Sequence, residues 1–247
     1  MPSAHAGILE SLGSWWKQKR EVAGSFAATR DLWLILREFL RDSTPERKRR
    51  RYGDIDFDWE YRVDTTAATV SWRARLMGLL NSPYQAIEPE LFRKMIALVN
   101  ADLNQFTFFD IGSGKGRALL LASQYRFRRI VGIELLAELN EVARENIQKF
   151  ARANQECQTI ETICADASEF NFPSEPLVIF LFNALPETKL KKLLTNLCNS
   201  LDLSPRPTFI LYGNPEFDQS FLSYPQLTRI SATQQYSIFA ATAESHF

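Results

Sequence analysis

The sequence has few of the residues that commonly serve as bases, nucleophiles and metal ligands. Its two histidines, His5 and His246, lie near the chain ends, where disorder is common. Its three cysteines, Cys157, Cys164 and Cys198, lack the paired spacing of zinc and redox sites. These shortages argue against zinc enzymes and most hydrolases, and unpaired cysteines fit a reducing cytoplasm.

Two further absences limit the partners of the chain. Lys plus Arg and Asp plus Glu number 29 each, so no net charge draws the protein toward nucleic acid. No apolar run approaches the roughly 20 residues that cross a bilayer, and no secretory signal opens the chain. The basic run Arg47–Arg51 is interpreted as a solvated linker, with a nucleic-acid or anionic-lipid patch as the alternative. We therefore expect a cytoplasmic protein with no transmembrane segment and no strong nucleic-acid signal.

Hydrophobic residues make up 45% of the 247 residues, and 18 are Phe, enough for one large core. Apolar spacing between residues 8 and 40 predicts one or two amphipathic helices. From Asp54 to Glu60, carboxylates alternate with Ile55, Phe57 and Trp59, which predicts a half-buried extended segment. A calcium-binding loop is disfavoured there because Trp59 stands where such a loop needs glycine.

From Gln105 onward, apolar strands alternate with helical stretches, as in βαβ units around a mainly parallel sheet. Strands are predicted at 106–111, 130–134, 159–164, 177–182, 208–212, 227–231 and 236–241. Helices are predicted at 117–124, 137–152 and 187–201. The short connection between the last two strands predicts an antiparallel hairpin at one sheet edge. The fold class is therefore α/β, with a Rossmann-like, seven-stranded, doubly wound sheet that is mostly parallel, plus an N-terminal helical extension.

A glycine-rich turn, Asp110-Ile-Gly-Ser-Gly-Lys-Gly-Arg117, follows the first predicted strand. Its three glycines permit a sharp turn and remove the Cβ atoms that would keep a ligand from the backbone. The spacing G-x-G-x-G differs from the G-x-G-x-x-G of nicotinamide cofactors, which lay a pyrophosphate on a helix N-terminus. Lys115 and Arg117 are interpreted as solvated residues that begin the next helix.

Two more acidic residues follow the next two strands. Glu134 ends the second strand, where a carboxylate can accept hydrogen bonds from both hydroxyls of a ribose. Asp166 follows the third strand and can accept a hydrogen bond from an adenine amino group. Because parallel strands end at the same edge of a sheet, Asp110, Glu134 and Asp166 should line one edge. The structural alternative is that each acidic residue only caps a helix.

With these motifs in this order, the chain resembles class I S-adenosylmethionine-dependent methyltransferases, whose first motif is an acidic residue followed by G-x-G-x-G. The resemblance extends from about Tyr84 to the C-terminus. It implies S-adenosylmethionine as the cofactor, with the glycines beside its methionine part, Glu134 at the ribose and Asp166 at the adenine. The cofactor-binding residues implied are Asp110, Gly112, Ser113, Gly114, Gly116, Glu134, Leu135, Asp166, Ala167, Asn183 and Glu88.

Two segments, Ser82–Pro89 and Leu181–Pro186, are similar to segments of the non-SET protein lysine methyltransferases, which include histone-directed and ATP-synthase-subunit-directed enzymes. Ala184 stands where those enzymes have proline. This narrower resemblance implies Asn183 and Tyr84 as catalytic residues, and N-methylation of a protein lysine or another amine. As structural alternatives, Asn183 could form a turn, Tyr84 could pack, and Glu88 could cap a helix.

The implied arrangement is an N-terminal helical extension and lid at residues 1–100 and a methyltransferase domain at residues 101–247. The acceptor is a protein or a small molecule. Two other functions stay open. An aminopropyltransferase shares the fold, but Leu181–Ala184 lacks the acidic residues that such enzymes carry after the fourth strand. A binding or regulatory module could keep the fold without turnover.

Overall fold

A computed structural model of the chain describes residue 25 and residues 55–66, 86–150, 155–182 and 185–241. The helices predicted between residues 8 and 40 lie outside this part of the chain, except that Ser25 is helical. The basic run Arg47–Arg51 also lies outside the described residues.

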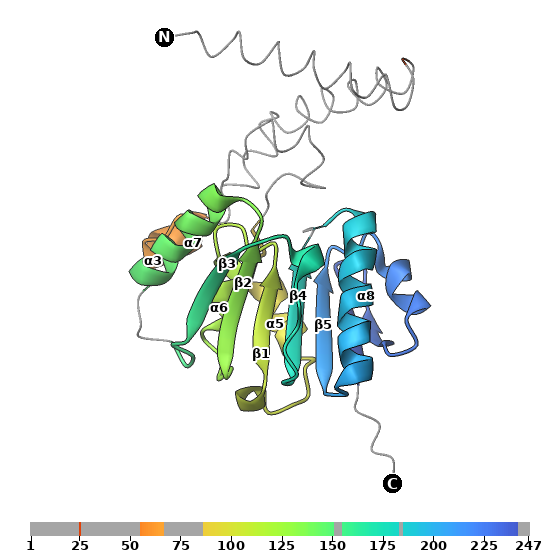
Figure 1. The fold of residues 1–247 in the computed structure, drawn as a ribbon. Helices are drawn as coiled ribbons and strands as arrows, with labels where there is room; N and C mark the ends of the chain where they lie inside the picture. The colour runs from red at the N-terminus through yellow and green to blue at the C-terminus, as the bar shows by residue number, and fades with distance from the viewer. Residues whose placement is uncertain (1–24, 26–54, 67–85, 151–154, 183–184, 242–247) are drawn as a thin grey trace.

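Seven strands form one sheet in the order β3-β2-β1-β4-β5-β7-β6 (Figure 1). Strands β1 to β5 pair in parallel, and β7 pairs antiparallel with both β5 and β6. Every predicted strand is confirmed to within one residue at each end, including the hairpin at the sheet edge. The strands are β1 (Thr107–Ile111), β2 (Arg129–Glu134), β3 (Ile160–Cys164), β4 (Leu177–Phe182), β5 (Thr208–Gly213), β6 (Thr228–Ala232) and β7 (Tyr236–Ala241).

Helices cover both faces of the sheet, as expected for a doubly wound fold. In Figure 1, α8 lies in front of the sheet and α5 and α6 lie behind it. Among the described helices, none is long and apolar enough to span a membrane. The helices are α3 (Ile55–Tyr61), α5 (Pro89–Ile96), α6 (Arg117–Ala122), α7 (Ala137–Lys149) and α8 (Glu187–Leu203), with the 3₁₀ turns η1 (Leu103–Gln105), η3 (Ala167–Glu169) and η4 (Asp218–Ser223).

The central strands are buried on both faces, which explains their nearly continuous apolar sequences. All five residues of β1 are buried. Alternate side chains enter the two layers of the core, since successive residues of a strand point to opposite faces. Phe108 and Phe180 pack against Phe92 of α5, with ring centroids 5.9 and 5.5 Å from it. Phe109 and Ile179 belong to the opposite core, beneath α8.

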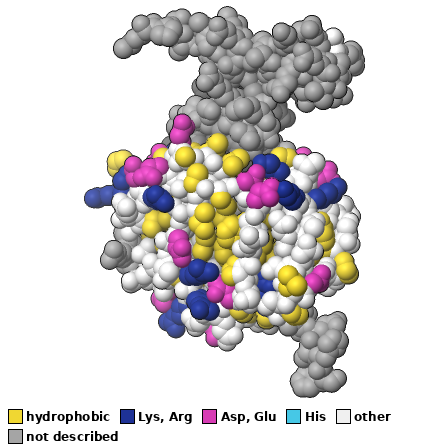
Figure 2. Space-filling model, viewed as in Figure 1, with side chains coloured by type: hydrophobic (Ala, Val, Ile, Leu, Met, Phe, Trp, Pro, Cys, Tyr) yellow, Lys and Arg dark blue, Asp and Glu magenta, His cyan; other side chains and the backbone are white. Residues whose placement is uncertain are grey.

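The face that carries α8 is thinly covered over β1 because the connection from β3 to β4 contains only the short turn η3. Phe170 and Phe172 of this connection pack on Phe109 of β1, at centroid distances of 5.5 and 5.8 Å. Figure 2 shows hydrophobic side chains gathered at the centre of this face, with charged side chains around them. Aromatic packing therefore replaces a helix here.

The prediction of an extended segment from Asp54 to Glu60 is wrong, because residues 55–61 form α3. In a helix, Phe57 and Tyr61 lie one turn apart on the same face. Their rings lie 6.5 and 4.9 Å from Phe150, which closes the end of α7. Trp59, which alternation would have placed on the buried face, is 84% exposed. Packing on Phe150 therefore favours a helix here, although the local alternation of polar and apolar residues favours a strand.

Candidate functional site

The glycine turn lies between β1 and α6, at the carboxyl edge of the sheet. The backbone N–H groups of Gly112 and Ser113 donate to the carbonyl of Ile133, at 2.8 and 3.1 Å. The N–H of Gly116 donates to the carbonyl of Ser113 at 2.8 Å, which closes the turn. Gly112, Gly114 and Gly116 have φ of 73°, 53° and 86°. Residues with side chains rarely adopt such angles.

Gly116 shows most clearly why the turn needs glycine. It precedes the first residue of α6, and a Cβ added to it would lie 3.2 Å from the Cβ of Ala143 on α7. The turn therefore lies close against α7. A side chain at this position would be opposed both by the backbone conformation and by the neighbouring helix.

Sequence reasoning missed Gly132, which lies within β2 and outside the glycine motif. A Cβ added there would lie 2.7 Å from Cδ1 of Leu119 and 2.8 Å from Oγ of Ser113. Gly132 thus makes room for the glycine turn and for α6 to lie on the sheet. A lone glycine within an apolar strand was the available signal, since it often marks a close approach of another segment.

Glu134 ties the glycine turn to the end of β2. One oxygen, Oε2, accepts a hydrogen bond from the N–H of Gly114 at 2.8 Å. The other, Oε1, accepts from the N–H of Leu136 at 2.8 Å. Glu134 is 3% exposed, and burial raises the pKa of its carboxyl although these backbone N–H groups lower it. The Glu134 carboxylate therefore helps to fix the shape of the turn.

Asp110 lies in β1, opposite Gly132 of β2, and is 4% exposed. Burial raises the pKa of the Asp110 carboxyl to about 8, and the charge of Glu134 adds to the rise. Two acidic groups are thus enclosed at the glycine turn. A cation bound there would lower the pKa of both, since an opposite charge favours the ionised form.

Asp166 lies at the N-cap of η3, after β3. Its Oδ1 accepts hydrogen bonds from the N–H and Oγ of Ser168, at 3.0 and 2.8 Å. Its Oδ2 accepts from Nζ of Lys189 at 2.7 Å. Burial alone raises the pKa of Asp166, but the hydrogen bonds from Lys189 and Ser168 bring it below its usual range. Capping, the structural alternative for Asp166, is therefore present, and one lone pair of Oδ2 is left for a ligand.

Of the remaining predicted residues, the structure describes Leu135, Ala167 and Glu88. Leu135 follows Glu134, and its carbonyl lies 3.8 Å from Sγ of Cys164. Ala167 is buried behind Asp166. Glu88 is exposed at the N-cap of α5, and its side chain makes no capping hydrogen bond. Tyr84 and Asn183 lie outside the described residues.

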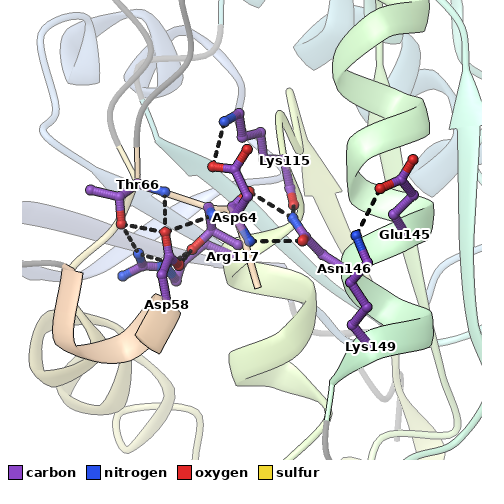
Figure 3. Close-up of polar contacts among 9 residues, drawn as sticks. Asp58, Asp64, Thr66, Lys115, Arg117, Glu145, Asn146 and Lys149 are labelled. Atoms are coloured by element: carbon purple, nitrogen blue, oxygen red, sulfur yellow. Dashed lines mark hydrogen bonds and ion pairs between the residues drawn. The ribbon is translucent and has the colours of Figure 1, made fainter. Parts of the chain in front are cut away.

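The interpretation of Lys115 and Arg117 as solvated residues is wrong. Their side chains are buried, with 7% and 1% of each residue exposed. Nζ of Lys115 donates to Oδ1 of Asp64 at 2.6 Å. Nη2 of Arg117 lies 3.2 Å from Oδ1 of Asp58 and donates to Oγ1 of Thr66 at 3.0 Å. Both cations of the glycine motif therefore pair with residues that follow or belong to α3, far away in sequence (Figure 3).

Asn146 of α7 joins the same two parts of the chain through backbone groups. Its Nδ2 donates to the carbonyls of Lys115 and Asp64, at 2.9 and 2.8 Å. Its Oδ1 accepts from the N–H of Asp64 at 2.9 Å. Sequence reasoning missed Asn146, because an asparagine within a helix carries no signal of its partner 82 residues away. We call Asp58–Thr66 the docking segment.

The acidic residues near the turn do not form a metal site. Within the described part of the chain, no group of three or more His, Cys, Asp or Glu side chains could hold a metal ion. Asp58, part of the disfavoured calcium motif, accepts hydrogen bonds from the N–H groups of Thr65 and Thr66, at 2.8 and 2.7 Å.

Comparison with known proteins identifies a domain. Residues 108–202 match the family described as "Methyltransferase domain", which confirms the predicted resemblance to methyltransferases. No curated protein sequence matches the chain.

Similar solved structures include an RNA methyltransferase from Salinibacter ruber in complex with S-adenosyl-L-homocysteine, at 21% identity and a TM-score of 0.41, over 65% of this chain and 95% of that one. A geranyl diphosphate methyltransferase in complex with sinefungin has 12% identity and a TM-score of 0.48, over 63% of this chain and 77% of that one. A possible methylase from Clostridium difficile has 15% identity and a TM-score of 0.45, over 65% and 54% of the two chains.

Proposed function

We propose that the chain is a class I S-adenosylmethionine-dependent methyltransferase whose methyl acceptor is an amine, either a protein lysine or another amine. The cofactor supplies the methyl group when bound. The residues of the chain bind the cofactor, orient the acceptor and exclude water.

The observation that carries the cofactor part of the proposal is the buried pair Asp110 and Glu134 at the glycine turn. S-adenosylmethionine has ammonium and sulfonium groups, and a cation bound at the turn would favour the ionised form of the Asp110 carboxyl, whose pKa burial raises to about 8. The turn has no Cβ at three positions where one would limit the approach of a ligand. Strand order also supports this place, since β2 and β4 lie on opposite sides of β1 and ligands bind at such a reversal.

The individual roles follow from position. Glu134 would hold the ribose, because each of its oxygens keeps a second lone pair beside its bond to the backbone. Asp166 would hold the adenine amino group through Oδ2, with Lys189 fixing the carboxylate. Ser113 would border the methionine part. Leu135 and Ala167 would flank the ribose and the adenine, and Glu88 would lie at the rim.

The acceptor part rests on Asn183 and Tyr84. Asn183 directly follows Phe182, the last residue of β4, which pairs with β1. Methyl transfer is an in-line displacement that needs positioning more than a strong base. The amide oxygen of Asn183 can accept a hydrogen bond from an amine and so orient its lone pair, and Tyr84 would close the site.

Titration calorimetry with S-adenosylmethionine tests the cofactor site. We expect Glu134→Gln to weaken binding at least tenfold (about 1.4 kcal/mol). The Gln amide has one oxygen in place of two, so its NH₂ group would face either a backbone N–H or a ribose hydroxyl that needs an acceptor. Glu145→Gln, on the exposed surface of α7 and paired with Lys149, is the matched control and should bind normally. Equal affinity in both variants would contradict the assignment of Glu134.

The acceptor is tested by incubating the enzyme with a cell extract and methyl-labelled cofactor. A protein amine is supported as the acceptor if protease releases the label, nuclease does not, and acetylation of lysines before the reaction prevents labelling. Label that only nuclease removes would contradict the proposal and indicate a nucleic-acid acceptor. Asn183→Ala should abolish labelling, and calorimetry on this variant measures whether Asn183 also contributes to cofactor binding.

We also propose that residues 1–100 form an extension that completes the site over the domain at residues 101–247. Its described parts, α3 and α5, pack on the face of the sheet that carries α6. A cytoplasmic location is supported by the free state of all three cysteines.

A further inference from the structure

The docking segment, Asp58–Thr66, is attached to the glycine turn at three independent points. Asp58 pairs with Arg117, Asp64 pairs with Lys115, and Asn146 bonds both Asp64 and the carbonyl of Lys115. Figure 3 shows these contacts converging from α3, α6 and α7. Two of the three involve the side chains that immediately precede and follow Gly116. The segment is therefore built onto the turn and not merely onto the surface of the domain.

Charge makes this attachment significant for the cofactor. Lys115 and Arg117 place two buried cations beside the turn, and a buried charge without a counter-ion is strongly unfavourable. S-adenosylmethionine itself carries a net charge of about +1 from its sulfonium, ammonium and carboxylate groups at neutral pH. S-adenosylhomocysteine has no sulfonium. Uncompensated cations at the turn would therefore repel the cofactor more than its demethylated product.

Asp58 and Asp64 provide the compensation from outside the glycine motif. Asp58 is largely enclosed, with 14% of its side chain exposed, whereas the side chain of Asp64 is 67% exposed. The Arg117 guanidinium also lies 4.4 Å from the ring centre of Phe57, which further stabilises its charge. These contacts hold each cation in place and offset its charge.

We infer that Asp58 and Asp64 are positioning residues of the cofactor site, which act through Arg117 and Lys115 to offset the positive charge of these two side chains and so favour S-adenosylmethionine over S-adenosylhomocysteine. The inference rests on the proposed function, because it takes the glycine turn as the place where the cofactor binds.

Asp64→Asn is the test variant, because Asp64 is mostly exposed and its replacement by Asn keeps the size of the side chain. Calorimetry should show affinity for S-adenosylmethionine reduced about tenfold and affinity for S-adenosylhomocysteine reduced less than about threefold. The double variant Lys115→Met/Asp64→Asn, which removes both charges, should recover affinity for S-adenosylmethionine to within about twofold of the wild type. Glu145→Gln, which removes a carboxylate elsewhere on the surface of α7, should bind both ligands normally.

The outcomes are separable. Equal loss of both ligands, no loss in Asp64→Asn, or no recovery in the double variant would each overturn the inference while leaving the proposed cofactor site in place. A wild-type protein that binds neither ligand would overturn the proposed function and the inference together. The variant Asp58→Asn, once thermal melting has shown that it is folded, should also lose more affinity for S-adenosylmethionine than for S-adenosylhomocysteine.

Discussion

Asp110 should make the stability of the protein depend on pH in a direction opposite to that of an ordinary carboxylate. Its pKa is raised from 3.8 to about 8, first by burial and then by Glu134. Between these two values the folded state holds a proton that the unfolded chain has released, so stability falls as pH rises. Above about 8 the loss is complete, and below the unfolded value it disappears.

We predict that wild-type protein loses about 2 to 3 kcal/mol more than Asp110→Asn when the pH is raised from about 6 to about 8.5. Urea unfolding at the two pH values measures this difference. Asn has nearly the shape of Asp and does not titrate, and Glu134 is present in both proteins, so the comparison isolates Asp110. Parallel pH profiles for the two proteins would show that Asp110 is ionised throughout.

At the scale of one element, α3 depends on tertiary contacts for its existence. It has seven residues, which is too short to be stable alone in water. Phe57 holds it to the domain through Phe150 and the guanidinium of Arg117, whereas Trp59 on the same helix is 84% exposed. The two aromatic side chains therefore form a matched pair for testing how α3 is attached.

We predict that Phe57→Ala removes about 3 to 5 kcal/mol of local packing and releases α3 without unfolding the sheet. Hydrogen exchange should lose protection in residues 55–66 and keep it in β1 and β4. Trp59→Ala should change stability by less than about 0.5 kcal/mol. Persistent protection of residues 55–66 in Phe57→Ala would show that the polar contacts of the docking segment suffice to hold it.

For the whole molecule, binding of the cofactor should appear as thermal stabilisation, because a ligand that binds only the folded state shifts the unfolding equilibrium. At a concentration of about one hundred times Kd, the gain is about 2.7 kcal/mol, which raises the Tm of a chain of this size by roughly 5 to 10 °C. S-adenosylmethionine should produce this shift in a thermal melt. ATP should not, since the turn has a spacing unlike that of phosphate-binding loops. A shift with ATP alone would contradict the cofactor assignment.

Much of the fold and part of the site follow from local sequence. Strand boundaries were predictable because central strands of a parallel sheet are continuous apolar runs, and the hairpin because two such runs are close together. The glycine turn was predictable because its three positive φ angles need glycine at fixed intervals. The positions of Glu134 at the end of β2 and of Asp166 after β3 were predictable by the rule that parallel strands end at one edge.

Contacts between distant parts of the chain decided the rest. Local alternation predicted an extended segment where packing on Phe150 stabilises α3. Lys115 and Arg117 were predicted to be solvated because their partners, 51 and 59 residues away, could not be identified from the sequence. The hydrophobic periodicity of the sequence shows only which face of an element is apolar, and not which other element that face contacts. Which buried cation meets which carboxylate depends on how the elements assemble. Sequence alone therefore determined the fold and the glycine turn, and tertiary structure decided which side chains surround that turn and pair with its cations.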